Sequence, residues 1–225
     1  MDDLTIRNNI AEQLSWDDRL DGSTINIEVQ KGIAMLTGTV DSYYAKNTAE
    51  QNVLQVKGVI VVKNELKVNN DKLTIPTDKE VRGRVKDLLY WNNDIDYSQI
   101  DVLVNNHVVT LLGSVSAYWK AVLVEELAYS IRGVTLVINQ LSVVPSKDYE
   151  DIKIADDIIK ALERTEGVAA HPITVKVDKG LVTLEGEVLS WRDKKAVFNA
   201  ALYTRGVKNI INNTKVASTD YAKKI

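Results

Sequence analysis

Few residues in this 225-residue chain stand in a pattern typical of acid–base, nucleophilic or metal chemistry. There is no cysteine, which excludes disulfides, thiolate catalysis and thiolate metal sites. The two histidines, His107 and His171, have no carboxylate at ligand-like spacing, and the sequence contains no phosphate loop, nucleophile elbow or paired acid–base motif. We therefore expect no catalytic residue, no metal site and no cofactor.

Two acidic segments were weighed as cation sites. Segment 94–98 places oxygen-bearing side chains at alternate positions, as a calcium-binding loop does at its start. The loop would need a glycine at Gln99 and a glutamate at Asn105, so we expect no calcium there. Segment 17–21, which carries three aspartates, is expected to be a solvated turn.

Surface chemistry is better supported, because two segments combine aromatic and basic residues. The first consists of Trp191, Arg192, Lys194 and Lys195, and the second of Arg82, Arg84 and Lys86, followed by Tyr90-Trp91. Cations with interfacial aromatic rings suit an anionic lipid surface. A solvated helix face is the alternative for both clusters. Trp91 is expected to pack within its module, since Trp16 stands at the equivalent position of a repeat.

The helices and strands that must position these residues belong to a sequence unit that occurs three times in the chain. Segments 36–40, 111–115 and 184–188 share a Leu-x-Gly-x-Val pattern and are separated by 75 and then 73 residues. The same two shifts align the rest of each copy without gaps. A repeat of this length marks a module, so the chain comprises three small modules. Residues that all copies keep are expected to be architectural, whereas residues that one copy alone carries are candidates for function.

Three sets of residues recur in every copy: a glycine where the second strand ends, a glycine after the second helix, and an asparagine in the last strand. They are Gly38, Gly113 and Gly186; Gly58, Gly133 and Gly206; and Asn64, Asn139 and Asn212. The first set is expected at a bulge or a close backbone approach. The second is expected at the C′ position of a helix, in the left-handed conformation. The asparagines are expected to pin a loop or strand end, because a buried amide must be hydrogen-bonded.

Hydrophobic spacing gives each copy the same order of elements. In the first copy, apolar residues at helical spacing and then at period two predict a helix near 6–14, strands at 25–29 and 33–40, a helix at 43–56 and a strand at 60–68. Lys31-Gly32 makes the strands a β-hairpin. The fold class is therefore α+β: three tandem α-β-β-α-β modules, each with a three-stranded mixed sheet and two helices on one face.

Two further features concern single positions of the repeat. His107 replaces the turn glycine of the other copies, Gly32 and Gly180, and is expected to adopt an unusual turn φ. Each second helix begins with an aromatic residue, in the pairs Tyr43-Tyr44, Tyr118-Trp119 and Trp191-Arg192. One member of each pair is expected to pack on its own sheet, and the other to be exposed.

Taken together, these features resemble the BON domain, named for bacterial osmotically inducible and nodulation proteins. The matching features are the hairpin that ends in Leu-x-Gly-x-Val, the glycine twenty residues later, and Val-x-Asn-x-Leu-x-Val in the last strand. The resemblance covers nearly the whole chain. It implies the α-β-β-α-β fold, a non-enzymatic role in envelope or osmotic-stress physiology, and anionic phospholipid as the ligand class.

The repeat also predicts the domain boundaries. We expect modules at residues 1–70, 75–145 and 148–218 and a tail at 219–225. Pro76 and Pro145 mark the boundaries at the two ends of the middle module, where neither a strand nor a helix is expected to continue.

Composition limits the partners and the location. With 45% hydrophobic residues, 26% charged residues and a net charge of −3, the chain is typical of a globular protein and lacks the strongly basic stripe expected for nucleic-acid binding. No apolar run is long enough to span a bilayer. Segment 1–7 is not a signal peptide, which predicts a cytoplasmic chain as written, or a periplasmic one if a leader was removed.

Two functions follow from these observations. The first is a tandem module that binds anionic phospholipid peripherally through its basic and aromatic helix faces. The second is a stress-related protein-interaction or chaperone-like role with an unidentified protein partner. Salt-sensitive vesicle binding favours the first function, and an exposed apolar patch favours the second.

Overall fold

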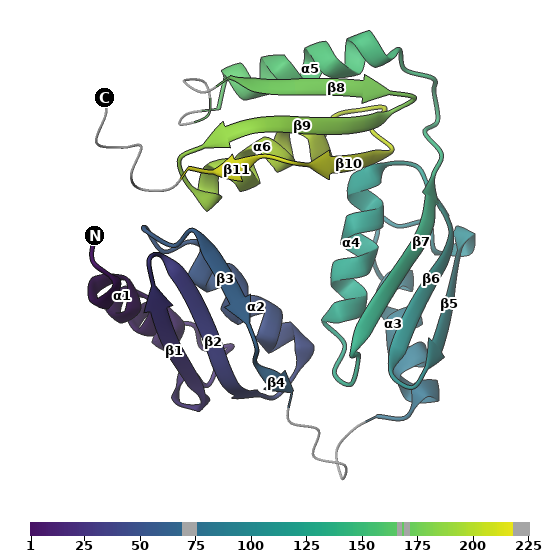
Figure 1. Ribbon diagram of the computed structural model, residues 1–225. Coiled ribbons are helices and arrows are strands. Elements are labelled where there is room, and N and C mark those ends of the chain that lie inside the picture. Colours follow the sequence, from purple (N-terminus) through teal and green to yellow (C-terminus); the bar gives the residue numbers. More distant parts are fainter. Residues whose placement is uncertain (69–75, 166–167, 169–171, 218–225) are drawn as a thin grey trace.

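The computed structural model describes residues 1–68, 76–165, 168 and 172–217, which form three modules of similar design (Figure 1). Module 1 contains α1 (Asp3–Ser15), η1 (Gly22–Thr24), β1 (Ile25–Gln30), β2 (Ile33–Val40), α2 (Tyr43–Leu54), β3 (Val61–Asn64) and β4 (Lys67–Val68). Module 2 contains α3 (Asp78–Tyr90), η2 (Tyr97–Gln99), β5 (Ile100–Asn105), β6 (Val108–Val115), α4 (Tyr118–Tyr129) and β7 (Leu136–Val143). Module 3 contains α5 (Asp151–Glu163), β8 (Ile173–Asp178), β9 (Leu181–Val188), α6 (Trp191–Leu202), β10 (Asn209–Asn212) and β11 (Lys215–Val216).

The predicted fold class is confirmed. In module 2 the central strand β6 pairs antiparallel with β5 and parallel with β7, so the sheet is mixed. Modules 1 and 3 have the same arrangement, with the last strand divided into β3 and β4, or β10 and β11. Each module has its own core between the helices and one face of the sheet.

The first helix of each module owes its position to three apolar residues at i, i+4 and i+8. In α3 these are Val81, Val85 and Leu89, all buried, and the equivalent residues of α1 and α5 are buried as well. A capping box starts α3, in which Thr77 accepts from the Glu80 backbone and the Glu80 carboxylate accepts from Thr77. This spacing places the basic residues of α3 on the face that points away from the core.

The glycine at the end of each hairpin stands where backbone approaches backbone. A Cβ built on Gly113 would overlap the carbonyl oxygen of Gln99, and the φ of Gly113 is +114°. At Gly186 the corresponding Cβ would lie 2.7 Å from the carbonyl oxygen of Pro172. Both the space and the backbone conformation therefore require glycine.

The glycine after the second helix differs from its predicted position. Gly58, Gly133 and Gly206 have positive φ, between +88° and +96°, but none of them is the C′ residue. The helix α2 already ends at Leu54 with Gln55 as its cap, and Gly58 follows in a second turn, in which Val59 N–H donates to the Val56 carbonyl. The helix stops earlier than the amphipathic pattern suggested, because consecutive i→i+3 turns replace its last residues.

A repeated carboxylate holds each hairpin turn against the first helix. Asp78, the first residue of α3, accepts hydrogen bonds from the N–H groups of Asn106 at 2.8 Å and His107 at 2.9 Å. Asp3 and Asp151 make the same pair of bonds in modules 1 and 3. The two turn residues of module 2 have positive φ, +48° and +64°, which confirms the conformation predicted for His107. The motif was missed in the sequence, although an aspartate stands at this position in all three copies.

The repeated asparagine joins the last strand to the second helix. Asn139 Nδ2 donates to the Ala121 carbonyl at 2.9 Å and to Glu125 Oε2 at 3.0 Å, while its Oδ1 accepts from Leu141 N–H at 3.1 Å. Asn64 makes the equivalent bonds in module 1. In module 3, Asn212 Oδ1 accepts from both the N–H and the hydroxyl of Thr214.

Replacing Asn139 with alanine is expected to destabilise module 2 by about 1–3 kcal/mol, because partly buried backbone groups lose their partners. Chemical denaturation followed by circular dichroism measures the change. Asn93→Ala, at an exposed site before η2, is the control and should alter the free energy of unfolding by less than about 0.5 kcal/mol. Equal midpoints for the two variants would contradict the structural role of Asn139.

The module boundaries are open to a direct test by limited proteolysis. Between modules 1 and 2, residues 69–75 lie outside the described residues, and Pro76 is buried so close to Gly133 that a Cβ there would lie 2.9 Å from the proline ring. In the second linker, Lys147 and its neighbours are exposed. We expect trypsin to cut first at the exposed Lys147 and at Lys72, because segments between modules are cleaved most readily. Early cleavage inside a hairpin, such as 25–40, would contradict the module boundaries.

Candidate functional site: basic and aromatic helix faces

The outer face of α3 carries two of the predicted basic residues, Arg82 and Lys86. Arg82 and Lys86 are one helical repeat apart, at i and i+4, so they share a face with Tyr90. Arg82 is exposed and Lys86 is half-buried. Within the described part of the chain, no ion pair includes either of them. The Asp78 carboxylate, four residues before Arg82 on the same face, is already bound to the hairpin turn.

Arg84 lies on a different side of α3, near the carboxylate of Glu80. Glu80, one turn earlier, is bound to Thr77, and the hydrogen bond from the Thr77 backbone is the main cause that lowers the pKa of Glu80. The positive charge of Arg84 contributes to the same shift. Arg84 therefore partly neutralises an acid of its own helix, which leaves Arg82 and Lys86 as the stronger candidates among the three predicted basic residues of α3.

An aromatic group closes this face at the end of the helix. Tyr90 is 66% exposed and Trp91 is 78% exposed. Their rings meet edge to face with centroids 5.3 Å apart, and the centroid of the Tyr97 ring lies 6.4 Å from that of Tyr90. Tyr90 and Trp91 therefore project beside the basic pair, whereas Tyr97 packs against the core of module 2.

The expected packing role of Trp16 and Trp91 is wrong. Trp16 is 80% exposed, slightly more than Trp91. Each tryptophan is the C-cap residue of its first helix, and at that point the chain turns away from the core, so the side chain projects outward. Arg164 occupies the equivalent cap position in module 3.

The cluster at the start of α6 is arranged differently, because Trp191 is engaged with another module. Its Nε1–H donates to the carbonyl oxygen of Ile60 in module 1 at 2.9 Å. Tyr118, at the same position of α4, packs against the core of module 3, and burial is the main cause that raises the pKa of its hydroxyl. In modules 2 and 3 the first aromatic residue of the second helix thus contacts a neighbouring module, a contact that the expected packing on its own sheet did not include.

Lys194 is also committed to the fold. Its Nζ donates to the Thr214 carbonyl at 2.7 Å and lies 4.9 Å from the centre of the Trp191 ring. Lys46 makes the equivalent bond to the Leu66 carbonyl in module 1, which marks the position as architectural. Burial lowers the pKa of Lys194. Of the four residues predicted here, only Arg192 and Lys195 are exposed.

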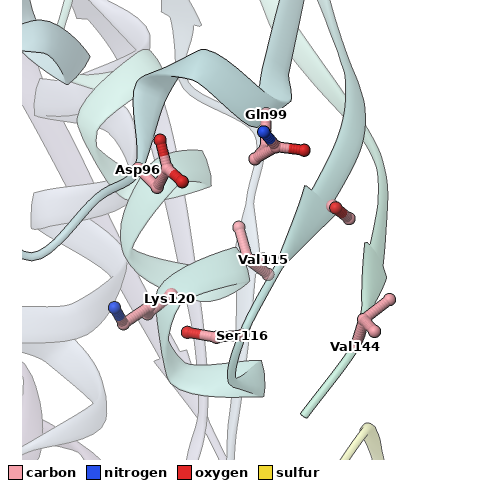
Figure 2. Close-up of a pocket in the computed structure, with 7 residues that line it drawn as sticks. Asp96, Gln99, Val115, Ser116, Lys120 and Val144 are labelled. Carbon is pink, nitrogen blue, oxygen red and sulfur yellow. The ribbon is translucent and has the colours of Figure 1, made fainter. Parts of the chain in front are cut away.

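A hollow of about 270 Å³ lies at the open end of module 2 (Figure 2). It is lined by Asp96, Gln99, Ser114, Val115, Ser116, Lys120 and Val144. The Asp96 carboxylate accepts from Ser98 N–H at 3.1 Å and from the Ser98 hydroxyl at 2.6 Å, so it caps η2. Among the described residues, the buried side-chain atom that lacks a hydrogen-bond partner is His107 Nδ1, which is not part of this hollow. We assign no ligand to the hollow.

The sequence predicts a solvated turn for the aspartates of segment 17–21, but Asp17 departs from this prediction. The side chain of Asp17 is only 12% exposed. It accepts from Arg19 Nη2 at 2.6 Å and from Asn52 Nδ2 at 2.6 Å. These two bonds, with that from Arg19 the larger cause, lower the pKa of Asp17. The aspartate thus ties the turn to α2.

The uncovered face of the module 2 sheet is unusually apolar. Leu103, Leu136 and Ile138 are 50%, 47% and 40% exposed there. Their equivalents are Glu28, Val61 and Lys63 in module 1, and Lys176, Asn209 and Ile211 in module 3. Because both helices cover the opposite face, this surface is open in the described chain.

These features define a class of protein. The family model of the BON domain matches residues 2–70, 77–145 and 150–218. The chain therefore belongs to the BON-domain family and contains three BON domains in tandem. None of its described helices has the length and apolar character needed to cross a membrane.

Several individual proteins are similar to this chain. Osmotically-inducible protein Y of Escherichia coli (strain K12) is 29% identical over 189 residues, which cover 80% of this chain and 92% of that protein. The 21 kDa hemolysin of Actinobacillus pleuropneumoniae is 26% identical over 148 residues, covering 64% of this chain and 75% of the relative. Among solved structures, CdsD, a structural protein of the type III secretion system of Chlamydia trachomatis, aligns over 96% of this chain and 94% of its own with 16% identity and a TM-score of 0.28.

Proposed function

We propose that this tandem BON-domain protein binds anionic phospholipid surfaces peripherally, without catalysis, and that module 2 carries the binding face. The observation that carries the proposal is the position of two exposed rings, Tyr90 and Trp91, beside Arg82 and Lys86 on one side of α3, where no ion pair within the described chain includes either cation. Tryptophan and tyrosine favour the boundary between water and lipid, and basic residues are attracted to anionic headgroups.

The energetics suit reversible attachment. Each basic residue near an anionic surface contributes about 1 kcal/mol, so a pair of them with two rings gives weak binding that salt screens. The net charge of −3 opposes approach at long range, and only a local basic face turned towards the lipid overcomes it. Similarity to osmotically-inducible protein Y supports a role for this binding in the bacterial response to osmotic stress.

Co-sedimentation with vesicles tests the proposal. We expect the protein to sediment with vesicles that contain phosphatidylglycerol, and not with neutral phosphatidylcholine vesicles, and we expect binding to fall when salt is raised. Trp91→Ala should weaken binding. Trp16→Ala is the matched control, because Trp16 is equally exposed while the helix before it carries one basic residue, Arg7. Equal binding to both vesicle types, or no binding at low salt, would contradict the lipid function.

A protein-interaction or chaperone-like role is the second candidate, and the apolar sheet face of module 2 favours it. An exposed apolar patch of this kind is typical of a protein-binding surface. The substitutions Leu103→Glu and Ile138→Lys would give that face the residues that module 1 has at these positions. If these changes abolish suppression of aggregation of an unfolded client while vesicle binding is absent, the second function replaces the first.

A further inference from the structure

In two of the three modules, the first residue of the second helix contacts another module. Trp191, the first residue of α6, donates its Nε1–H to the Ile60 carbonyl, which directly precedes β3 of module 1. Tyr118, the first residue of α4, packs against the core of module 3. There its hydroxyl is hydrogen-bonded to the backbone of Ile210 in β10. In both junctions, an aromatic residue at a helix start meets the beginning of a third strand.

The two junctions have the same direction: module 2 contacts module 3, and module 3 contacts module 1. One aromatic position and one third strand then remain, Tyr43 at the start of α2 and β7 of module 2. Figure 1 shows α2, α4 and α6 on the inner side of the molecule, with α1 and α5 on the outside. Tyr43 is half-buried although it begins a helix at the surface of its own module.

The start of β7 has the same local structure as the site that receives Trp191. Thr135 is the equivalent of Ile60, 75 residues along the chain. Thr135 N–H donates to the His107 carbonyl at 2.9 Å, just as Ile60 N–H donates to the Gly32 carbonyl at 2.8 Å. The carbonyl group at this position is therefore held in the same orientation relative to the hairpin turn in both modules.

We propose that Tyr43 docks at the start of β7, beside Thr135, and that this third junction closes the three modules of one chain into a ring. The occupant is an aromatic residue of the same chain, because both observed junctions are made by that position. The arrangement does not depend on lipid binding, and it leaves the outer face of α3 free.

Distance measurements between spin labels test the ring, and the chain suits them because it has no cysteine of its own. Labels at Gln13→Cys in module 1 and Asn93→Cys in module 2, both exposed positions, report on the proposed junction. We expect a narrow distance distribution in the parent. Trp191→Ala removes the junction between modules 3 and 1, and the narrow peak should persist because Tyr43 still holds module 1 on module 2.

Adding Tyr43→Ala to Trp191→Ala should abolish the narrow peak, whereas Tyr43→Trp should preserve it, since module 3 uses tryptophan at this position. Tyr44→Ala in the Trp191→Ala background is the matched control. The Tyr44 hydroxyl accepts from Arg19 within module 1, so this change should leave the peak intact. Circular dichroism confirms folding of each variant. Loss of the peak in Trp191→Ala alone, its persistence in the double variant, or a Tyr43-dependent dimer in sedimentation would overturn the closed ring.

Discussion

Gly113→Ala is expected to destabilise module 2 by about 3 kcal/mol or more, because backbone strain and overpacking act together. The new Cβ would overlap the carbonyl oxygen of Gln99, and the φ of +114° is one that only glycine adopts readily. The carbonyl is fixed by the hairpin register, in which Ile100 pairs with Gly113. The strand end cannot move away without breaking that pairing.

Hydrogen exchange measured by mass spectrometry locates this effect, since three linked modules need not unfold together. Peptides from module 2 should lose protection, and peptides from modules 1 and 3 should keep it. Gly83→Ala is the control, and we expect it to change the stability of module 2 in the opposite direction. Gly83 lies within α3, where an added Cβ meets no atom within 4 Å, so alanine should stabilise the helix by about 0.5–1 kcal/mol. Unchanged protection of module 2 in Gly113→Ala would show that the hairpin accommodates a side chain there.

Reversing two charges on α3, with Arg82→Glu and Lys86→Glu together, is expected to lower partitioning onto anionic vesicles by roughly 30-fold. The figure corresponds to about 1 kcal/mol for each cation removed, or about 2 kcal/mol in all, and the introduced negative charges add to it. Co-sedimentation at low salt measures the change, and circular dichroism confirms that the variant is folded.

The matched set is Arg192→Glu with Lys195→Glu, the two exposed cations of the cluster on α6. This pair should lower binding less, because the ring beside it, that of Trp191, is held against module 1. A larger loss from the α6 set would move the binding face to module 3. If neither set lowers binding, lipid attraction does not reside in these cations.

The internal repeat made the fold predictable. Apolar spacing such as Val81, Val85 and Leu89 depends on helix geometry alone, and the hairpin glycines mark positions where a side chain cannot fit. Comparison of the three copies separated such residues from those that one module alone carries. The same comparison contained the aspartate that binds each hairpin turn, but its role became visible only when its partners, distant in sequence, were placed.

Exposure and contacts between modules were decided by the tertiary structure. Trp16 and Trp91 share a position in the repeat, which suggested packing, yet both project into solvent because the chain turns at the helix cap. Sequence spacing also grouped Trp191 with Lys194 as surface residues, although the first contacts Ile60, 131 residues away, and the second binds a strand carbonyl. By itself the sequence determined the modules, since their periodicity and glycines act over a few residues. Which faces stay free was decided by packing between modules, which brings together residues from distant parts of the chain.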